Sequence, residues 1–159
     1  AGTEGLIFLP YLVGERTPHA DPDARAAFVG LDIRHDRGAL VRAVLEGVAF
    51  GLRDSLALIA ELGGAPALGR VSGGGARSEL WLRIVASVLE LPLERVAVDE
   101  GAAFGAAILG GVAAGAWPDV QAGVAATVRA GARIEPVPEW VQTYAETQER
   151  FRSLYPAVR

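Results

Sequence analysis

The strongest candidate for a functional site is the segment Gly73-Gly74-Gly75-Ala76-Arg77-Ser78. The segment follows a short apolar run and precedes an amphipathic stretch. Glycines let a backbone approach a ligand with no Cβ in the way, and free N–H groups at a helix start attract anionic or polar ligands. The pattern therefore predicts a nucleotide-binding turn. A turn that only reverses the chain through unusual dihedral angles is the alternative, and the local pattern does not decide between the two.

A second candidate follows the next predicted strand, Asp99-Glu100-Gly101-Ala102-Ala103-Phe104-Gly105-Ala106-Ala107. An acidic pair at a helix N-terminus interacts favourably with the helix dipole, and Gly105 would allow close packing of that helix. Capping alone is a sufficient explanation for Asp99 and Glu100. Both candidates nevertheless lie at strand carboxyl ends, where open α/β sheets bind their ligands, so they can face one crevice.

The third candidate is the loop Gly14-Glu15-Arg16-Thr17-Pro18. Glu15 and Arg16 can form an ion pair, and most such pairs only hold a loop to its domain. Contact of Glu15, Arg16 or Thr17 with a substrate or a phosphate group is the second interpretation. His19 and His35 occur singly, without a partner base or metal-ligand spacing, and receive no chemical role.

The three candidates lie among predicted helices and strands. Apolar residues recur at three- and four-residue spacing from Val41 to Ile59, which predicts a long helix. Strands are expected at Leu6–Leu9, Leu68–Ser72 and Leu93–Val98. Further helices are expected from Ser78 onward, at Ala102–Ala114 and at Pro138–Leu154.

The remaining segments are expected to be loops and short runs. Pro10–Asp36 predicts a long packed loop, and a hairpin-like pair of runs is expected near Val128 and Ile134. The order of elements predicts crossover connections and neighbouring parallel strands. The chain is therefore expected to form one α/β domain.

Composition narrows the possible chemistry. The 159 residues are 51% hydrophobic and 21% charged, as expected of one compact domain. The absence of Cys excludes disulfides, thiolate nucleophiles and Cys-ligated zinc. All fifteen basic residues are Arg, which excludes a Walker A lysine and a Schiff base in this chain. A net charge of −4 with scattered Arg residues argues against nucleic acid as a partner.

The N-terminal residues and the most apolar segment indicate where in the cell the protein is expected. The first residues carry neither an initiator Met nor the pattern of a secretory signal, which suggests a piece of a longer chain. The apolar run from Gly101 to Trp117 is rich in Ala and Gly and shorter than the ~20 residues that a bilayer requires. We therefore expect a cytoplasmic domain with no membrane partner, and leave a homodimer open.

Several of these segments, taken in order, resemble the FGGY family of carbohydrate kinases, and within it the xylulose kinases. Leu9-Pro10-Tyr11-Leu12 and the loop from Gly14 to His19 are similar to a xylulose kinase loop. Ala26–Glu46 resembles the second FGGY signature, with Ala39 where the family usually has a polar residue. Gly73–Trp81 resembles the adenosine-binding segment, and Glu100–Ala107 the Glu-x-x-Ala-x-Gly-Ala-Ala motif.

The resemblance implies an actin-like, ribonuclease H-like ATPase fold, of which residues 1–159 would be the C-terminal nucleotide-binding domain. The N-terminal sugar-binding lobe and the start of the C-terminal lobe would be absent. The implied reaction is transfer of the γ-phosphoryl group of MgATP to D-xylulose, giving xylulose 5-phosphate. Since the family's catalytic Asp would also lie outside this chain, we expect no kinase activity from the chain alone.

The resemblance also implies roles for individual residues. Gly73, Gly74 and Gly75 would lie against ATP or ADP, Ala76 and Ser78 would line the adenosine side, and Arg77 would stack on the nucleotide or reach a phosphate. Glu100 and Gly105 would shape the pocket, and Mg²⁺ would be held mostly by phosphates and the missing lobe. Two alternatives stay open, namely another FGGY sugar such as gluconate, ribulose or glycerol, and a non-catalytic nucleotide-binding or interaction domain.

Overall fold

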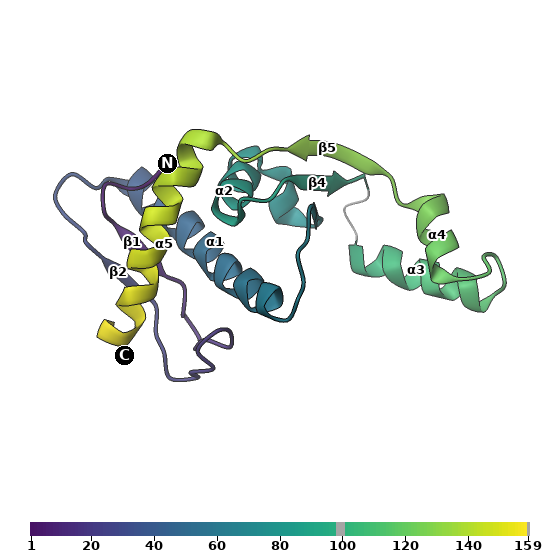
Figure 1. The fold of residues 1–159 in the computed structure, drawn as a ribbon, viewed down its shortest axis with the longest axis horizontal. Helices are drawn as coiled ribbons and strands as arrows, with labels where there is room; N and C mark the ends of the chain where they lie inside the picture. Colours follow the sequence, from purple (N-terminus) through teal and green to yellow (C-terminus); the bar gives the residue numbers. More distant parts are fainter. Residues whose placement is uncertain (98–100, 159) are drawn as a thin grey trace.

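The fold is an α/β arrangement of two small sheets and a set of helices (Figure 1). The computed structural model describes residues 1–97 and 101–158, so the predictions made for Asp99 and Glu100 lie outside the described residues. The elements in chain order are β1 (Ile7–Leu9), β2 (Ala27–Val29), α1 (Arg37–Glu61), β3 (Gly69–Val71), the 3₁₀ turn η1 (Gly74–Arg77), α2 (Glu79–Leu89), β4 (Leu93–Val96), α3 (Gly101–Ala113), α4 (Val120–Thr127), β5 (Ala130–Ile134) and α5 (Pro138–Val158).

The larger sheet has the strand order β3-β4-β5. β3 and β4 pair in parallel with Gly69 opposite Leu93, which confirms the predicted parallel neighbours. β5 runs antiparallel to β4, with Ile134 opposite Leu93. The expected hairpin near Val128 and Ile134 is therefore wrong, because the single strand there pairs with β4 and follows a helix, α4, that was not predicted.

A smaller sheet holds the N-terminal part of the chain. β1 pairs antiparallel with β2, with Phe8 opposite Phe28. The segment predicted as one long loop thus contains β2, and its packed character comes from that pairing. β1 lies directly on α1, since a Cβ built on Gly47 would sit 2.1 Å from the carbonyl oxygen of Phe8. Glycine is required at this crossing.

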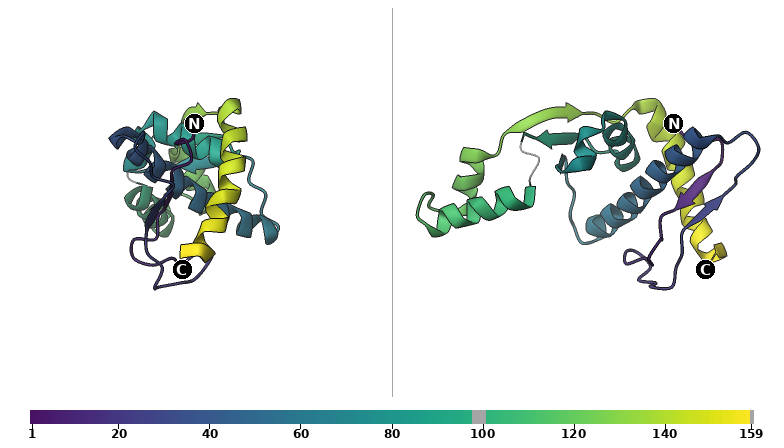
Figure 2. Two further views of the ribbon diagram at one scale, coloured as in Figure 1. Left: turned by 90° about the vertical axis from the view of Figure 1, so that its left-hand side faces the viewer. Right: turned by 180° about the vertical axis from the view of Figure 1, so that it is seen from behind.

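The core lies where α1, α2 and α5 meet β1 and β4. α5 crosses α1 in the ribbon views (Figures 1 and 2), and its Tyr144 and Phe151 are 0% and 1% exposed. Asp36 caps the N-terminus of α1, since its carboxylate accepts the N–H of Ala39 at 2.8 Å. This cap supplies the helix start that Ala39 itself does not favour.

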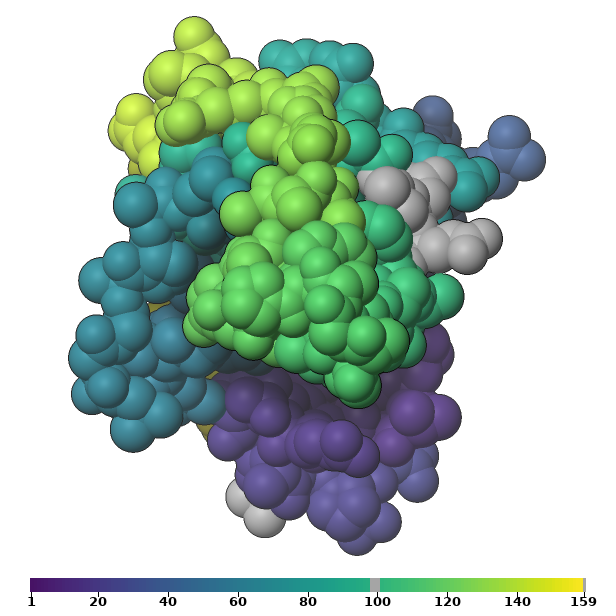
Figure 3. Space-filling view, turned by 90° about the vertical axis from the view of Figure 1, so that its right-hand side faces the viewer, coloured from purple at the N-terminus to yellow at the C-terminus, as the bar shows by residue number. Residues whose placement is uncertain are grey.

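The α3–α4 pair lies away from this core (Figures 1 and 2). It is the part nearest the viewer in Figure 3. The two helices are wedged apart by Trp117, whose ring would lie 2.3 Å from a Cβ at Gly111 and 3.2 Å from one at Gly123. Although α3 is composed almost wholly of apolar residues, only Ile108 is buried along it. One side of α3 is therefore apolar and uncovered within the described chain.

Candidate functional site

The glycine segment forms a tight turn between β3 and α2. Gly73 has φ +85° and ψ −175°, a backbone conformation that favours glycine. The turn is closed by hydrogen bonds from Ala76 N–H to the Gly73 carbonyl at 3.0 Å and from Ser78 N–H to the Gly75 carbonyl at 3.2 Å. The Ser78 hydroxyl then caps α2 by accepting the N–H of Trp81 at 3.2 Å. The predicted strand, glycine turn and helix are thus confirmed.

One side of this turn is open. A Cβ at Gly73 or Gly74 would meet no atom within 4 Å, whereas one at Gly75 would lie 3.2 Å from Nε1 of Trp81. Gly74 and Gly75 are exposed. Their N–H groups donate to no acceptor in residues 1–97 and 101–158. Free amides on an open side at the start of a helix are suited to an anionic or strongly polar ligand.

Ala76, Arg77 and Ser78 differ in which of their groups are accessible to a ligand. Ala76 is buried at 8% exposure, so its methyl group points into the protein and only its backbone is accessible to a ligand. The Ser78 hydroxyl is already engaged as the cap of α2. Arg77 is exposed at the end of the turn. The turn therefore presents mainly glycine backbone.

The predicted meeting of the two strand ends occurs at Ser72 and Gly101. A Cβ on Gly101 would lie 2.9 Å from Oγ of Ser72, so the start of α3 touches the residue just before the glycine turn. Beside this contact is a pocket of about 250 Å³ with a mostly apolar lining. Its residues are Ser72, Val96, Ala97, Gly101, Phe104, Gly105, Ile108, Val124, Val128 and Arg129.

Gly105 lines this pocket but does not make the close helix contact expected of it. A Cβ at Gly105 would meet nothing within 4 Å. The close approaches occur instead at Gly111 and Gly123, against Trp117. The prediction of tight packing at Gly105 is therefore wrong within the described chain, because the helix face that carries Gly105 has no neighbour there.

The Gly14–Pro18 loop is held by Glu15, but not through Arg16. The Glu15 carboxylate accepts the backbone N–H groups of His19 at 2.6 Å and Ala20 at 3.1 Å. The expected Glu15–Arg16 ion pair is absent, because the carboxylate is turned into its own loop. Arg16 and Thr17 are exposed, and Arg16 makes no ion pair with any residue of the described ranges.

Sequence reasoning missed the residues that fasten this loop to α5. His19, to which no chemical role was given, stacks on Tyr155 with ring centroids 3.7 Å apart and planes 4° from parallel. The Tyr155 hydroxyl donates to Oδ2 of Asp21 at 2.6 Å. No local pattern could have revealed these contacts, since the partners are at opposite ends of the chain.

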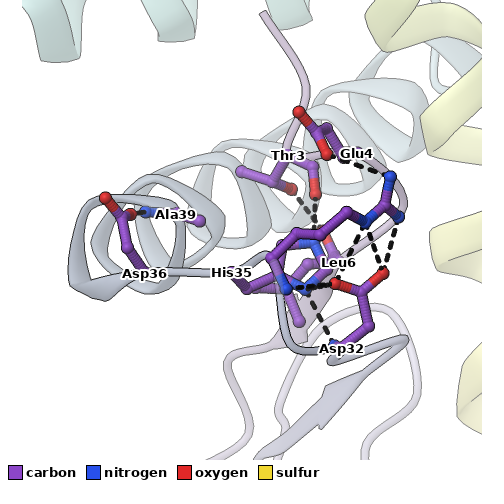
Figure 4. A network of polar contacts seen from close by, with 8 residues as sticks. Thr3, Glu4, Leu6, Asp32, His35, Asp36 and Ala39 are labelled. Carbon is purple, nitrogen blue, oxygen red and sulfur yellow. Dashed lines mark hydrogen bonds and ion pairs between the residues drawn. The ribbon is translucent and has the colours of Figure 1, made fainter.

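Two further networks fix the N-terminal segment. His35 is buried, with Nδ1 accepting the N–H of Asp32 at 2.9 Å and Nε2 donating to the Thr3 carbonyl at 3.0 Å (Figure 4). The hydrogen bonds from Arg34 hold the pKa of the Asp32 carboxyl at about 2, below its usual value. These residues connect the chain start to the loop before α1.

The second network is centred on Glu46, which is 2% exposed. Its Oε1 accepts the Gly2 N–H at 3.1 Å, Nε of Arg42 at 2.7 Å and the Tyr144 hydroxyl at 2.8 Å. Arg42 also donates to the Tyr144 oxygen at 2.6 Å. Burial and then the Glu46 charge raise the pKa of Tyr144 above its ordinary value. This network binds α5 to α1.

Within residues 1–97 and 101–158, no three His, Cys, Asp or Glu side chains are grouped so that they could hold a metal ion. The glycine turn presents donors, whereas Mg²⁺ requires oxygen ligands. Among the described helices, none has the length and apolar character needed to cross a membrane.

Residues 1–114 match the family model for the C-terminal domain of the FGGY family of carbohydrate kinases. The chain belongs to the FGGY family. This FGGY domain has the α/β, actin-like ATPase fold of the family's C-terminal domains, which confirms the fold expected from the sequence.

Known relatives of the FGGY domain include kinases of more than one sugar. The xylulose kinase of Bacillus subtilis is 33% identical over 97% of this chain, which spans 31% of that protein. The ligand-bound xylulose kinase structure from Lactobacillus acidophilus has a TM-score of 0.89 at 29% identity, covering 99% of this chain and 32% of that one. The gluconate kinase from the same organism has a TM-score of 0.88 at 29% identity, with the same coverages. The chain thus spans about a third of the length of its relatives.

Proposed function

We propose that this FGGY domain is the nucleotide-binding part of a kinase that transfers the γ-phosphate of ATP to D-xylulose. The observation that carries the proposal is the open side of the Gly73–Ser78 turn, where the N–H groups of Gly74 and Gly75 donate to no acceptor within the described part of the chain. Phosphoryl transfer depends on positioning the nucleotide and neutralising charge. The turn supplies positioning through backbone, which suits a chain that has no Lys.

Each residue of the turn has a distinct part in this proposal. Gly74 and Gly75 lie against the nucleotide and donate from their main-chain N–H groups. Arg77 provides the side chain that stacks or pairs with a phosphate, and Ser78 keeps the turn in place by capping α2. Gly105 shapes the neighbouring pocket rather than contacting ATP. Glu15, Arg16 and Thr17 form a loop at the edge of the cleft.

We infer that turnover requires a second lobe that supplies the base, the sugar pocket and the Mg²⁺ ligands. Three observations support this division. The relatives are about three times as long as this chain. α3 presents an uncovered apolar side. α1 carries an exposed apolar stripe on the side away from the core, formed by Val41, Val48, Leu52 and Ile59. Contiguous exposed apolar surface of this kind marks a docking face.

The direct test of nucleotide binding is calorimetric titration of the chain with ADP. Gly74→Val places a branched side chain on the open side of the turn, and the control Gly51→Val adds the same side chain in α1, where a Cβ would meet nothing within 4 Å. We expect Gly74→Val to weaken ADP binding at least tenfold and Gly51→Val to leave it unchanged. Equal affinity of the wild type and Gly74→Val for ADP would contradict the proposal.

The identity of the sugar is tested separately, with the complete kinase. Turnover of xylulose is compared with that of gluconate, ribulose and glycerol at equal concentration. We expect the highest kcat/KM for xylulose, because xylulose kinases are among the most similar relatives. A higher kcat/KM for another sugar would show that this other sugar, and not xylulose, is the preferred substrate. If the chain binds another protein tightly and restores no turnover when mixed with the missing lobe, an interaction domain becomes the better assignment.

A further inference from the structure

A second pocket, polar in character, lies between the first half of α2 and the strands β4 and β5. It encloses about 330 Å³ and is lined chiefly by charged side chains. Glu79 and Arg83 come from α2, and Arg95 comes from β4. Arg133 belongs to β5, and Glu135 directly follows that strand. None of these residues takes part in the glycine turn, in the apolar pocket beside Ser72 or in the networks that hold α5.

The three arginines of this pocket differ in their partners. Arg133 is paired with Glu135, with Nε 2.5 Å from Oε1. Arg83 has no carboxylate partner within the described ranges, and its guanidinium lies over the ring of Trp140 at 5.1 Å from the centroid. Arg95 is only partly buried, but its Nε is fully buried and has no hydrogen-bond partner. Arg83 and Arg95 therefore line the pocket without an ion pair to any carboxylate of the described residues, although Glu79 lines it as well.

A buried donor without an acceptor is uncommon in native proteins, and a bound ion or water is the usual explanation. Guanidinium groups bind phosphate and carboxylate oxygens through two N–H groups at once. The ring of Trp140 behind Arg83 and the strand that carries Arg95 limit the motion of both side chains. Arg83 is exposed, but its contact with Trp140 restricts the side chain before a ligand arrives and so lowers the conformational entropy lost on binding.

We propose that this pocket binds the phosphate group of a hydroxylated phosphate monoester. Arg83 and Arg95 hold the phosphate oxygens, and the Glu79 carboxylate accepts hydrogen bonds from hydroxyl groups of the ligand. Glu79 directly follows Ser78, the residue that ends the glycine turn and caps α2. A sugar phosphate in this pocket therefore contacts the same helix that borders the nucleotide turn, so its site is separate from that turn but adjacent to it.

The test is titration of the 159-residue chain with inorganic phosphate and with xylulose 5-phosphate, followed by NMR and calorimetry at constant ionic strength. Arg83→Gln and Arg95→Gln are compared with Arg37→Gln, which removes an exposed Arg at the start of α1. We expect saturable binding in wild type and Arg37→Gln, and at least tenfold weaker binding in the two pocket variants. Unsaturable binding, or equal affinity in all four proteins, overturns the site.

Two further comparisons complete the test. Tighter binding of xylulose 5-phosphate than of inorganic phosphate supports the monoester, and the reverse order overturns it. If saturating ADP abolishes phosphate binding, the pocket is part of the nucleotide site and the separate site is overturned. Loss of ADP binding in Gly74→Val with phosphate binding unchanged keeps the two proposals distinct. Should Arg95→Gln unfold, as judged by circular dichroism, Arg83→Gln and Arg95→Lys carry the comparison.

Discussion

His19 and Tyr155 lie face to face, with ring centroids 3.7 Å apart, and this stack joins the Gly14–Pro22 loop to the end of α5. The Tyr155 hydroxyl adds a hydrogen bond to Asp21 at 2.6 Å. Gly14 completes the anchoring, since its φ is +90° and a Cβ there would lie 2.7 Å from the Pro22 carbonyl. The loop is thus held by the last helix and by its own tight bend.

Removal of the Tyr155 ring should loosen this loop. Tyr155→Leu is expected to lower the free energy of unfolding by about 2 kcal/mol, and Tyr155→Phe, which keeps the stack, by about 1 kcal/mol. Urea denaturation measures both values. Because the chain has no Lys, trypsin cuts only at Arg, and cleavage after Arg16 should accelerate in Tyr155→Leu. Identical cleavage rates in all three proteins would show that the stack does not hold the loop.

Substitution of Glu46 should lower the free energy of unfolding more than substitution of an ordinary Glu in a helix. Glu46→Ala leaves Arg42 and the Tyr144 hydroxyl without their acceptor, so we expect a loss of about 3 kcal/mol in unfolding free energy. Tyr144→Phe keeps the ring and removes one hydroxyl, so a loss of about 1 kcal/mol is expected. A double-mutant cycle by urea denaturation gives their coupling, and strictly additive losses would contradict the network.

Stability should fall at high pH because of Tyr11. Burial, followed by the charge of Glu15, raises the pKa of Tyr11 from 10.0 to about 12. The folded protein therefore favours the protonated phenol, so its stabilising contribution is complete below pH 10.0 and is lost as the pH rises to about 12. Urea denaturation at pH 9.5 and at pH 11.5 is expected to show a smaller loss in Tyr11→Phe than in wild type; an equal loss would rule Tyr11 out as the cause.

Two glycines of α1 provide a matched pair. Gly47→Ala forces a methyl group to within 2.1 Å of the Phe8 carbonyl oxygen, so we expect a loss of about 3 kcal/mol. Gly51→Ala meets nothing within 4 Å and should stabilise the helix by about 0.5–1 kcal/mol. Thermal unfolding of the two variants measures the contrast. Equal melting temperatures would mean that β1 does not lie against α1 at Gly47.

The sequence predicts the long helix but not which of its faces is buried. The apolar residues that reveal the period include Val41, Val48 and Ile59, which are exposed here. The buried side instead carries Glu46 and Asp54 among small and aromatic residues. Their carboxylates are satisfied by α5, as when Asp54 accepts Nε2 of Gln148 at 2.8 Å and Nε of Arg152 at 2.6 Å. Such contacts between distant segments leave no periodic signal.

The glycine turn was predictable for a different reason. Its dihedral angles, its hydrogen bonds and the Ser78 cap are local, so they depend only on residues that are adjacent in the sequence. α4 escaped prediction because Val120–Thr127 is mostly Ala, Val and Gly and has no clear amphipathic period. The pairing of β5 with β4 likewise depends on a register between segments that are far apart in sequence.

Each of the three tryptophans lies in a different region of this molecule. Trp81 borders Gly75 at the open turn, Trp117 fills the angle between α3 and α4, and Trp140 lies beneath the guanidinium groups of Arg42 and Arg83. Proteins that retain one indole at a time would therefore emit from one region only. Fluorescence can then follow the Gly73–Ser78 turn, the α3–α4 pair and the surroundings of Arg83 separately, with no label attached.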